Sequence, residues 1–175
     1  MFKFYSGIGS RNTPVKILEQ MGAIALKLSD LGYILRSGHA NGADLAFEKS
    51  AFQAEIWLPW SRFNYDNALK AENHIHNIIS SDDEEAFNSV ARLHPMPSNL
   101  SQGAFKLMAR NYRQIIGLNA PNSEFVVCYT KDGKDSGGTG QAIRLAIENN
   151  IPVYNLQHDG IYEFCLTIGS NNGQL

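Results

Sequence analysis

The sequence contains little of what marks a secreted or membrane protein. Only two of its 175 residues are cysteines, Cys128 and Cys165, so it has no disulfide framework of the kind that stabilises small secreted domains. No apolar run is long enough to span a bilayer, and the first residues, "MFKFYSG", do not form a signal-peptide pattern. We therefore expect a cytoplasmic protein that is not bound to a membrane.

An excess of positive charge is also absent. The chain has 15 Lys and Arg residues against 17 Asp and Glu residues, which gives a formal net charge of −2 at pH 7. Proteins that bind nucleic acid without sequence preference usually carry clustered basic residues. The charge balance therefore disfavours nucleic acid as a partner, although it leaves room for a local basic groove.

Two common nucleotide-binding motifs are missing as well. The P-loop pattern G-x-x-x-x-G-K-[ST] does not occur. The segment "GIGSRN" has Asn12 in place of the third glycine of the dinucleotide fingerprint, and the next expected strand ends in Arg36 and Ser37 without an acidic residue. These absences exclude a P-loop NTPase and an ordinary NAD site, and we expect no cofactor.

Short apolar segments typical of strands alternate with segments of helical periodicity. We expect strands near residues 1–8, 33–37, 55–59, 124–130 and 151–156. Helices are expected to begin near residues 14, 43, 102 and 137, the third of them capped by Ser101. With 43% hydrophobic residues, the chain can bury one core. The pattern predicts a single α/β Rossmann-like domain over residues 1–175, with a mostly parallel sheet flanked by helices.

Residues 61–102 fit this alternation least well. They are polar, and we interpret them as an inserted section of helix and loop, with a helix around residues 65–80. On such a helix His74 and His76 would point to opposite sides, so we expect no metal site there.

Three glycine-bearing turns each follow an expected strand: "SGIGSR", "SGHANGAD" and "SGGTG". The carboxyl ends of parallel strands meet at one edge of the sheet, where ligands of such folds bind. Each turn also places backbone N–H groups before a helix N-terminus, which favours phosphates and carboxylates. The three turns together predict an anion-binding site at this edge.

The order and spacing of four motifs resemble the SLOG superfamily: "GIGSR", "RSGHANGAD", "ARNYRQIIGL" and "SGGTGQAIRLA". This superfamily contains the Rossmann-like core of the DNA processing protein A (DprA) family and the LONELY GUY nucleotide hydrolases. The chain is most similar to the compact DprA-like proteins common in bacteriophage genomes, over residues 4–156. The superfamily includes DNA binders, nucleotide sensors and N-glycosidases, so the resemblance does not select one activity.

The resemblance implies a set of ligand-binding residues. They are Gly7, Gly9, Ser10, Arg11, Ser37, Gly38, Gly42, Asp44, Arg110, Asn111, Gly137, Gly138, Thr139 and Gly140. Gln114 shares a helix with Arg110, while Trp60 and His94 are candidates for contact with a base. The chain departs from the LONELY GUY pattern at Ser136, where those enzymes have proline, and at Gln141 and Ala142, where they have acidic residues.

Three functions fit these observations. The favoured one is binding or sensing of a phosphorylated, nucleotide-derived small molecule. An alternative is a nucleotide N-glycosidase, because Asp44 and Glu48 are four residues apart and lie on one helical face. The other alternative is DprA-like binding of single-stranded DNA in recombination. We also expect a homo-oligomer, most simply a dimer, because twofold pairing is the commonest assembly.

Overall fold

The computed structural model describes residues 2–65 and 73–170, and within them six parallel strands form one sheet in the order β4-β3-β2-β1-β5-β6. The strands are β1 (Lys3–Gly9), β2 (Tyr33–Ser37), β3 (Ala54–Leu58), β4 (His74–Ile78), β5 (Val126–Tyr129) and β6 (Val153–Asn155). Every pair of neighbours is parallel. The prediction of a Rossmann-like α/β domain with a parallel sheet is confirmed.

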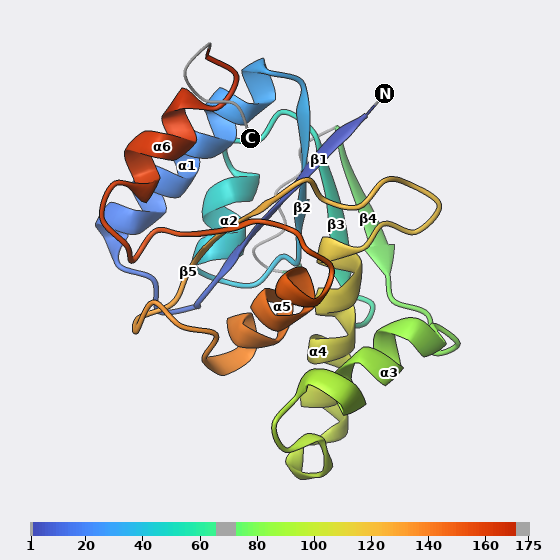
Figure 1. Cartoon of the computed structure of the whole chain (residues 1–175). Coiled ribbons are helices and arrows are strands. Elements are labelled where there is room, and N and C mark those ends of the chain that lie inside the picture. Colours follow the sequence, from blue (N-terminus) through green and yellow to red (C-terminus); the bar gives the residue numbers. More distant parts are fainter. Residues whose placement is uncertain (1, 66–72, 171–175) are drawn as a thin grey trace.

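Helices cover both faces of this sheet (Figure 1). On one face lie α1 (Val15–Asp30), α2 (Ala43–Glu48) and α6 (Ile161–Thr167), and on the other lie α4 (Gln102–Ile115) and α5 (Gly137–Glu148). The helix α3 (Glu84–Leu93) packs against α4, and a short 3-10 helix, Pro97–Asn99, connects the two. Because both faces are covered, all four residues of β5 are buried. No helix in the described ranges combines the length and the apolar character needed to cross a bilayer.

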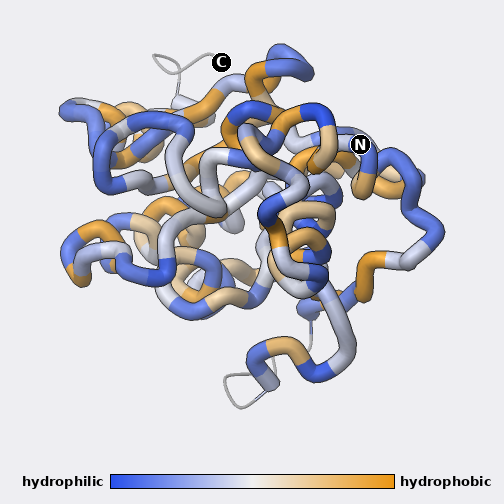
Figure 2. The backbone as a smooth tube through the Cα atoms, turned by 90° about the horizontal axis from the view of Figure 1, so that it is seen from below, coloured by the Kyte–Doolittle hydropathy of each residue, from blue (hydrophilic) through white to orange (hydrophobic). Residues whose placement is uncertain are grey.

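Local sequence signals explain where several helices begin. The Ser101 hydroxyl accepts a hydrogen bond from the Ala104 amide at 3.2 Å, which confirms its predicted role as the cap of α4. Asp83 caps α3 in the same way, through Ala86 N. Figure 2 shows that hydrophilic residues occupy most of the outer loops. Hydrophobic residues of the strands and helices form the buried core clusters.

The prediction of a helix around residues 65–80 is wrong for the part of this range that the structure describes. Residues 74–78 form β4, which pairs with β3 from Ala54↔His74 to Leu58↔Ile78. Part of the 61–102 section is therefore an edge strand of the sheet and not only helix and loop; residues 66–72 lie outside the described part of the chain.

Candidate functional site

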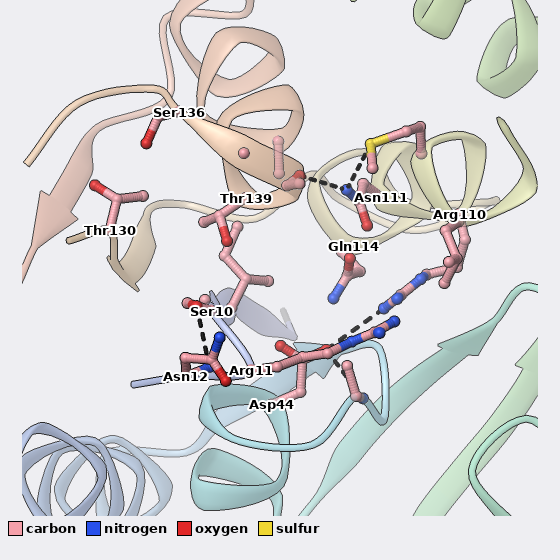
Figure 3. A pocket seen from close by; sticks show the side chains of 18 of the residues that line it. Ser10, Arg11, Asn12, Asp44, Arg110, Asn111, Gln114, Thr130, Ser136 and Thr139 are labelled. Atoms are coloured by element: carbon pink, nitrogen blue, oxygen red, sulfur yellow. Dashed lines mark hydrogen bonds and ion pairs between the residues drawn. The ribbon is translucent and has the colours of Figure 1, made fainter. Parts of the chain in front are cut away.

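A pocket of about 480 Å3 lies at the carboxyl ends of β1 and β5 (Figure 3). These two strands are neighbours, but the chain leaves β1 toward α1 on one face of the sheet and leaves β5 toward α5 on the other. This is the topological switch point at which open α/β sheets bind ligands. The lining residues are Ile8, Gly9, Ser10, Arg11, Asn12, Ala40, Asp44, Leu107, Met108, Arg110, Asn111, Gln114, Thr130, Lys131, Ser136, Gly137, Gly138, Thr139 and Ala142.

The loop after β1 forms one wall, and a glycine in the next turn allows α2 to approach it. Gly42 has a φ of 84°, and a β-carbon there would lie 2.6 Å from both Ser10 O and Arg11 O. With no side chain at Gly42, the Ala43 amide reaches Ser10 O at 3.3 Å. The loop is thereby fixed by backbone contacts, which leaves the exposed Arg11 side chain at the pocket.

A buried ion pair forms the floor of the pocket. Arg110 and Asp44 are both 4% exposed, and Arg110 Nη1 lies 3.5 Å from Asp44 Oδ2. The same carboxylate oxygen accepts a hydrogen bond from Ala40 N at 3.2 Å. Burial raises the pKa of Asp44 to about 6, although Arg110 acts in the opposite direction. Burial also lowers the pKa of the Arg110 guanidinium.

Positive charge outweighs negative charge around this floor. Figure 3 shows the Arg11 side chain extending toward the Arg110 guanidinium, and the proximity of Arg11 contributes to the lowered pKa of Arg110. Lys131 adds a third cation from the loop after β5. Among the residues that line the pocket, Asp44 is the one carboxylate. Positive charges that lie close together without enough negative charge to balance them attract an anion into the space between them.

Two buried donors at the pocket also lack an acceptor. Within the described ranges, Arg110 Nε and Gln114 Nε2 have no hydrogen-bond partner, although Gln114 is only 2% exposed. Figure 3 shows the Gln114 amide between the Arg110 and Ser10 sides of the pocket. A buried amide without an acceptor is costly, and such groups are rare in folded proteins.

The N-terminus of α5 forms the opposite wall. Its capping residue Ser136 donates its hydroxyl to Asp132 Oδ1 at 2.8 Å, so the Ser136 side chain does not cap the first-turn amides of the helix. Asn111 Nδ2 donates to Gly138 O at 3.1 Å and so holds this turn against α4. Gly137 and Gly138 are exposed, which leaves the helix N-terminus open to an anion.

The structure brings together ten of the predicted site residues. Gly9, Ser10, Arg11, Asp44, Arg110, Asn111, Gln114, Gly137, Gly138 and Thr139 all line the pocket. Gly38 and Gly42 lie behind it and support Arg110 and the β1 loop. Gly140 packs against the backbone of Asp135, and the Ser37 hydroxyl is buried without a partner among the described residues.

Four further predicted site residues also lie outside the pocket. Gly7 is inside β1, opposite Val127, and its missing side chain makes room for the Phe47 ring. Glu48 points away, because its two carboxylate oxygens accept from His39 N at 2.9 Å and pair with His39 Nδ1 at 2.7 Å. His94 ends α3 and accepts from Met96 N, and Trp60 packs edge-on against Phe63. Asp44 and Glu48 therefore do not form a carboxylate pair in the pocket.

Four polar lining residues were not predicted: Asn12, Thr130, Lys131 and Ser136. Thr130 and Lys131 directly follow β5, so the rule that ligands bind at the carboxyl ends of strands would have found them. Asn12 lies in the loop after β1, and Ser136 precedes α5.

No protein-family model matches the sequence, and no curated protein is detectably similar to it. The fold is similar to a solved structure of DNA processing protein A from Helicobacter pylori, described for its single-stranded DNA binding mode. The match has a TM-score of 0.64 at 18% identity and covers 95% of this chain and 73% of the other. The prediction that favoured a nucleotide-derived small molecule and disfavoured nucleic acid as partner is therefore wrong. Net charge describes the whole surface, and it does not reveal that Arg11, Arg110 and Lys131 gather at one pocket.

Proposed function

We propose that this chain is a compact DprA-like protein of the SLOG superfamily that binds single-stranded DNA. In this proposal residues 1–175 act as one domain, with residues 61–102 inserted into the Rossmann-like core. A phosphate of the DNA backbone occupies the pocket at the carboxyl ends of β1 and β5. The observation that carries the proposal is the pair of buried, unpartnered donors, Arg110 Nε and Gln114 Nε2, beside cations and an open helix N-terminus.

Each part of the pocket suits a phosphate. The first-turn amides of α5 and the partial positive charge of the helix dipole favour an anionic oxygen. The planar guanidinium of Arg110 can donate to several oxygens of one phosphate group. The Arg11 guanidinium, which lies near it, can donate to the same group. Gln114 supplies a neutral donor from the floor.

A continuous strand suits the pocket better than an isolated phosphate does. Arg110 and Gln114 are buried, whereas Arg11 and Lys131 are exposed on separate loops, one after β1 and one after β5. The buried pair would hold one phosphate, and the exposed pair would contact the phosphates before and after it. The similar fold of a DNA-binding structure, which covers nearly the whole chain, supports single-stranded DNA as the partner.

Fluorescence anisotropy of a labelled 20-nucleotide thymidine oligomer tests the proposal. We expect Arg11→Ala and Lys131→Ala each to weaken binding about tenfold, because each loses a charge-assisted phosphate contact of about 1–2 kcal/mol. Each should also make the affinity less dependent on salt. Lys49→Ala is the matched control, because Lys49 is exposed at the far end of α2 and outside the pocket.

Two results would contradict the proposal. One is the absence of binding by the unmodified chain at low salt. The other is binding that Lys49→Ala weakens as much as Lys131→Ala does, because the attraction would then depend on overall charge and not on the pocket.

A further inference from the structure

The loop after β3 exposes two aromatic side chains at the same edge of the sheet as the pocket. Trp60 is 39% exposed and Tyr65 is 64% exposed. Neither ring belongs to the hydrophobic clusters of the described residues, whereas the other tryptophan, Trp57, is buried in β3. Packing of the core therefore does not account for these two rings.

The loop is held in a defined conformation. Arg62 and Asn64 have φ angles of 62° and 54°. Residues other than glycine rarely adopt this left-handed backbone conformation. Asn64 Nδ2 donates to His39 O at 2.8 Å and to Asn41 Oδ1 at 2.9 Å, which fastens the loop to the turn before α2. Backbone strain that the surrounding structure maintains is common at binding sites.

A chain of contacts joins Trp60 to the pocket. Trp60 packs edge-on against Phe63, with ring centroids 5.3 Å apart and an interplanar angle of 88°. The Phe63 ring centroid in turn lies 5.8 Å from the Arg110 guanidinium. Arg110 forms part of the pocket floor, so the aromatic loop and the phosphate site are adjacent.

The loop also carries a cation next to an exposed ring. The Arg62 guanidinium lies over the Tyr65 ring, 5.7 Å from its centroid. Aromatic faces interleaved with arginine are the typical surface on which proteins bind single-stranded DNA, because every base can stack on an aromatic ring. A second protein would need a larger apolar area than these two rings provide.

We infer that residues 59–65 form a base-stacking platform that continues the path of the DNA from the phosphate pocket. This inference rests on the proposed function. The phosphate in the pocket fixes the strand, and a neighbouring base stacks on Trp60, with a further base at Tyr65 and Arg62. The platform recognises the faces of the bases and not their edges, so it gives affinity without sequence preference.

Two oligomers separate this inference from the proposed function. One is the 20-nucleotide thymidine oligomer, and the other is an abasic oligomer of the same length, which keeps the phosphates but has no bases. We expect Trp60→Ala to weaken binding of the thymidine oligomer about tenfold and to leave binding of the abasic oligomer unchanged. Phe52→Ala, which removes an exposed aromatic ring outside this loop, should change neither.

A spectroscopic readout adds a direct test. In Trp57→Phe, Trp60 is the remaining tryptophan, and stacking on a base should quench its fluorescence with the thymidine oligomer but not with the abasic one. If the chain binds the thymidine oligomer while Trp60→Ala has no effect and Trp60 is not quenched, the platform is refuted and the phosphate pocket stands. If the chain binds neither oligomer, the proposed function itself fails.

Discussion

Arg110 Nη1 occupies the position that a β-carbon on residue 38 would take, so Gly38 and Arg110 can be neighbours only because residue 38 has no side chain. Gly38 also leaves space for the Gln114 amide, which would lie 2.7 Å from such a carbon. One glycine at the end of β2 thus makes room for both buried donors of the pocket floor.

Gly38→Ala should therefore disturb the pocket without removing any group that we propose to contact DNA. The methyl group displaces Arg110 and weakens its pairing with Asp44. We expect the free energy of unfolding to fall by about 1–3 kcal/mol and the DNA affinity to fall about tenfold. Urea denaturation and fluorescence anisotropy measure the two effects.

The control for this prediction is Gly103→Ala in the first turn of α4. A β-carbon there meets nothing within 4 Å, so the substitution should leave DNA affinity unchanged and stabilise the helix slightly. If Gly38→Ala matches this control, the close approach of Arg110 does not matter for binding.

Gly138→Val tests the helix N-terminus that faces the pocket. A β-carbon on Gly138 meets only the Met108 methyl carbon, at 3.4 Å, so the fold has room for a side chain. The valine would fill the space where we propose that the phosphate binds, and DNA binding should fall at least tenfold. Gly103→Val, at the equivalent position of α4, should bind DNA normally; equal affinities of the two variants would place the phosphate elsewhere.

The raised pKa of Asp44 leads us to predict that DNA binding depends on pH. Its pKa is raised to about 6 by burial, so its negative charge in the pocket is lost as the pH falls through that value. The affinity for DNA should accordingly rise between pH 7.5 and pH 5.5. Asp44→Asn keeps an acceptor oxygen for Ala40 N but carries no charge.

Anisotropy titrations at several pH values compare the two proteins. We expect the variant to bind more tightly than the unmodified chain at pH 7.5 and to depend less on pH. All other titratable groups are present in both proteins, so their contribution cancels in the comparison. Parallel pH profiles would show that Asp44 does not control the charge of the pocket.

Arg113 should be structural, although it lies on the same helix as Arg110. It donates from Nε and Nη2 to the two oxygens of Asp83 at 2.6 and 2.7 Å, and both side chains are nearly buried. Arg113→Ala leaves the Asp83 charge unpaired and should lower the free energy of unfolding by about 3 kcal/mol, with no change in the DNA affinity of the folded protein.

The exposed Arg92–Glu148 pair provides the comparison for this prediction. Arg92→Ala should change the free energy of unfolding by less than about 1 kcal/mol, because water screens that pair. A loss of DNA affinity in folded Arg113→Ala would mean that the binding surface extends along α4 beyond the pocket.

Local signals explain why much of the fold could be predicted from the sequence. The strand at residues 33–37 and the Ser101 cap depend on residues close in the chain, and both occur as expected. The strand β4 could not be found in this way. Only His74 of its five residues is buried, and the strand is defined by pairing with β3, which a local pattern does not reveal.

Some features of the candidate site could likewise be predicted from the sequence, whereas others depend on how distant segments pack together. The meeting of the β1 loop and the α5 turn at one edge follows from the alternation of strands and helices along the chain, because parallel strands end at the same edge. The contact of Gly38 with Arg110 and the pairing of Glu48 with His39 depend on how α4 and α2 pack on the sheet. Net charge describes the whole chain, and it does not show that Arg11, Arg110 and Lys131 gather at one pocket.

Hydrogen exchange of the backbone amides, with and without the thymidine oligomer, tests the central claim most directly. If a DNA phosphate binds at the pocket, exchange should slow most at residues 9–12 and 137–140, where the β1 loop and the first turn of α5 meet. The amides at the far end of α2, around Lys49, should not change. Binding of DNA that leaves 9–12 and 137–140 unprotected, or that protects another surface instead, would contradict the account.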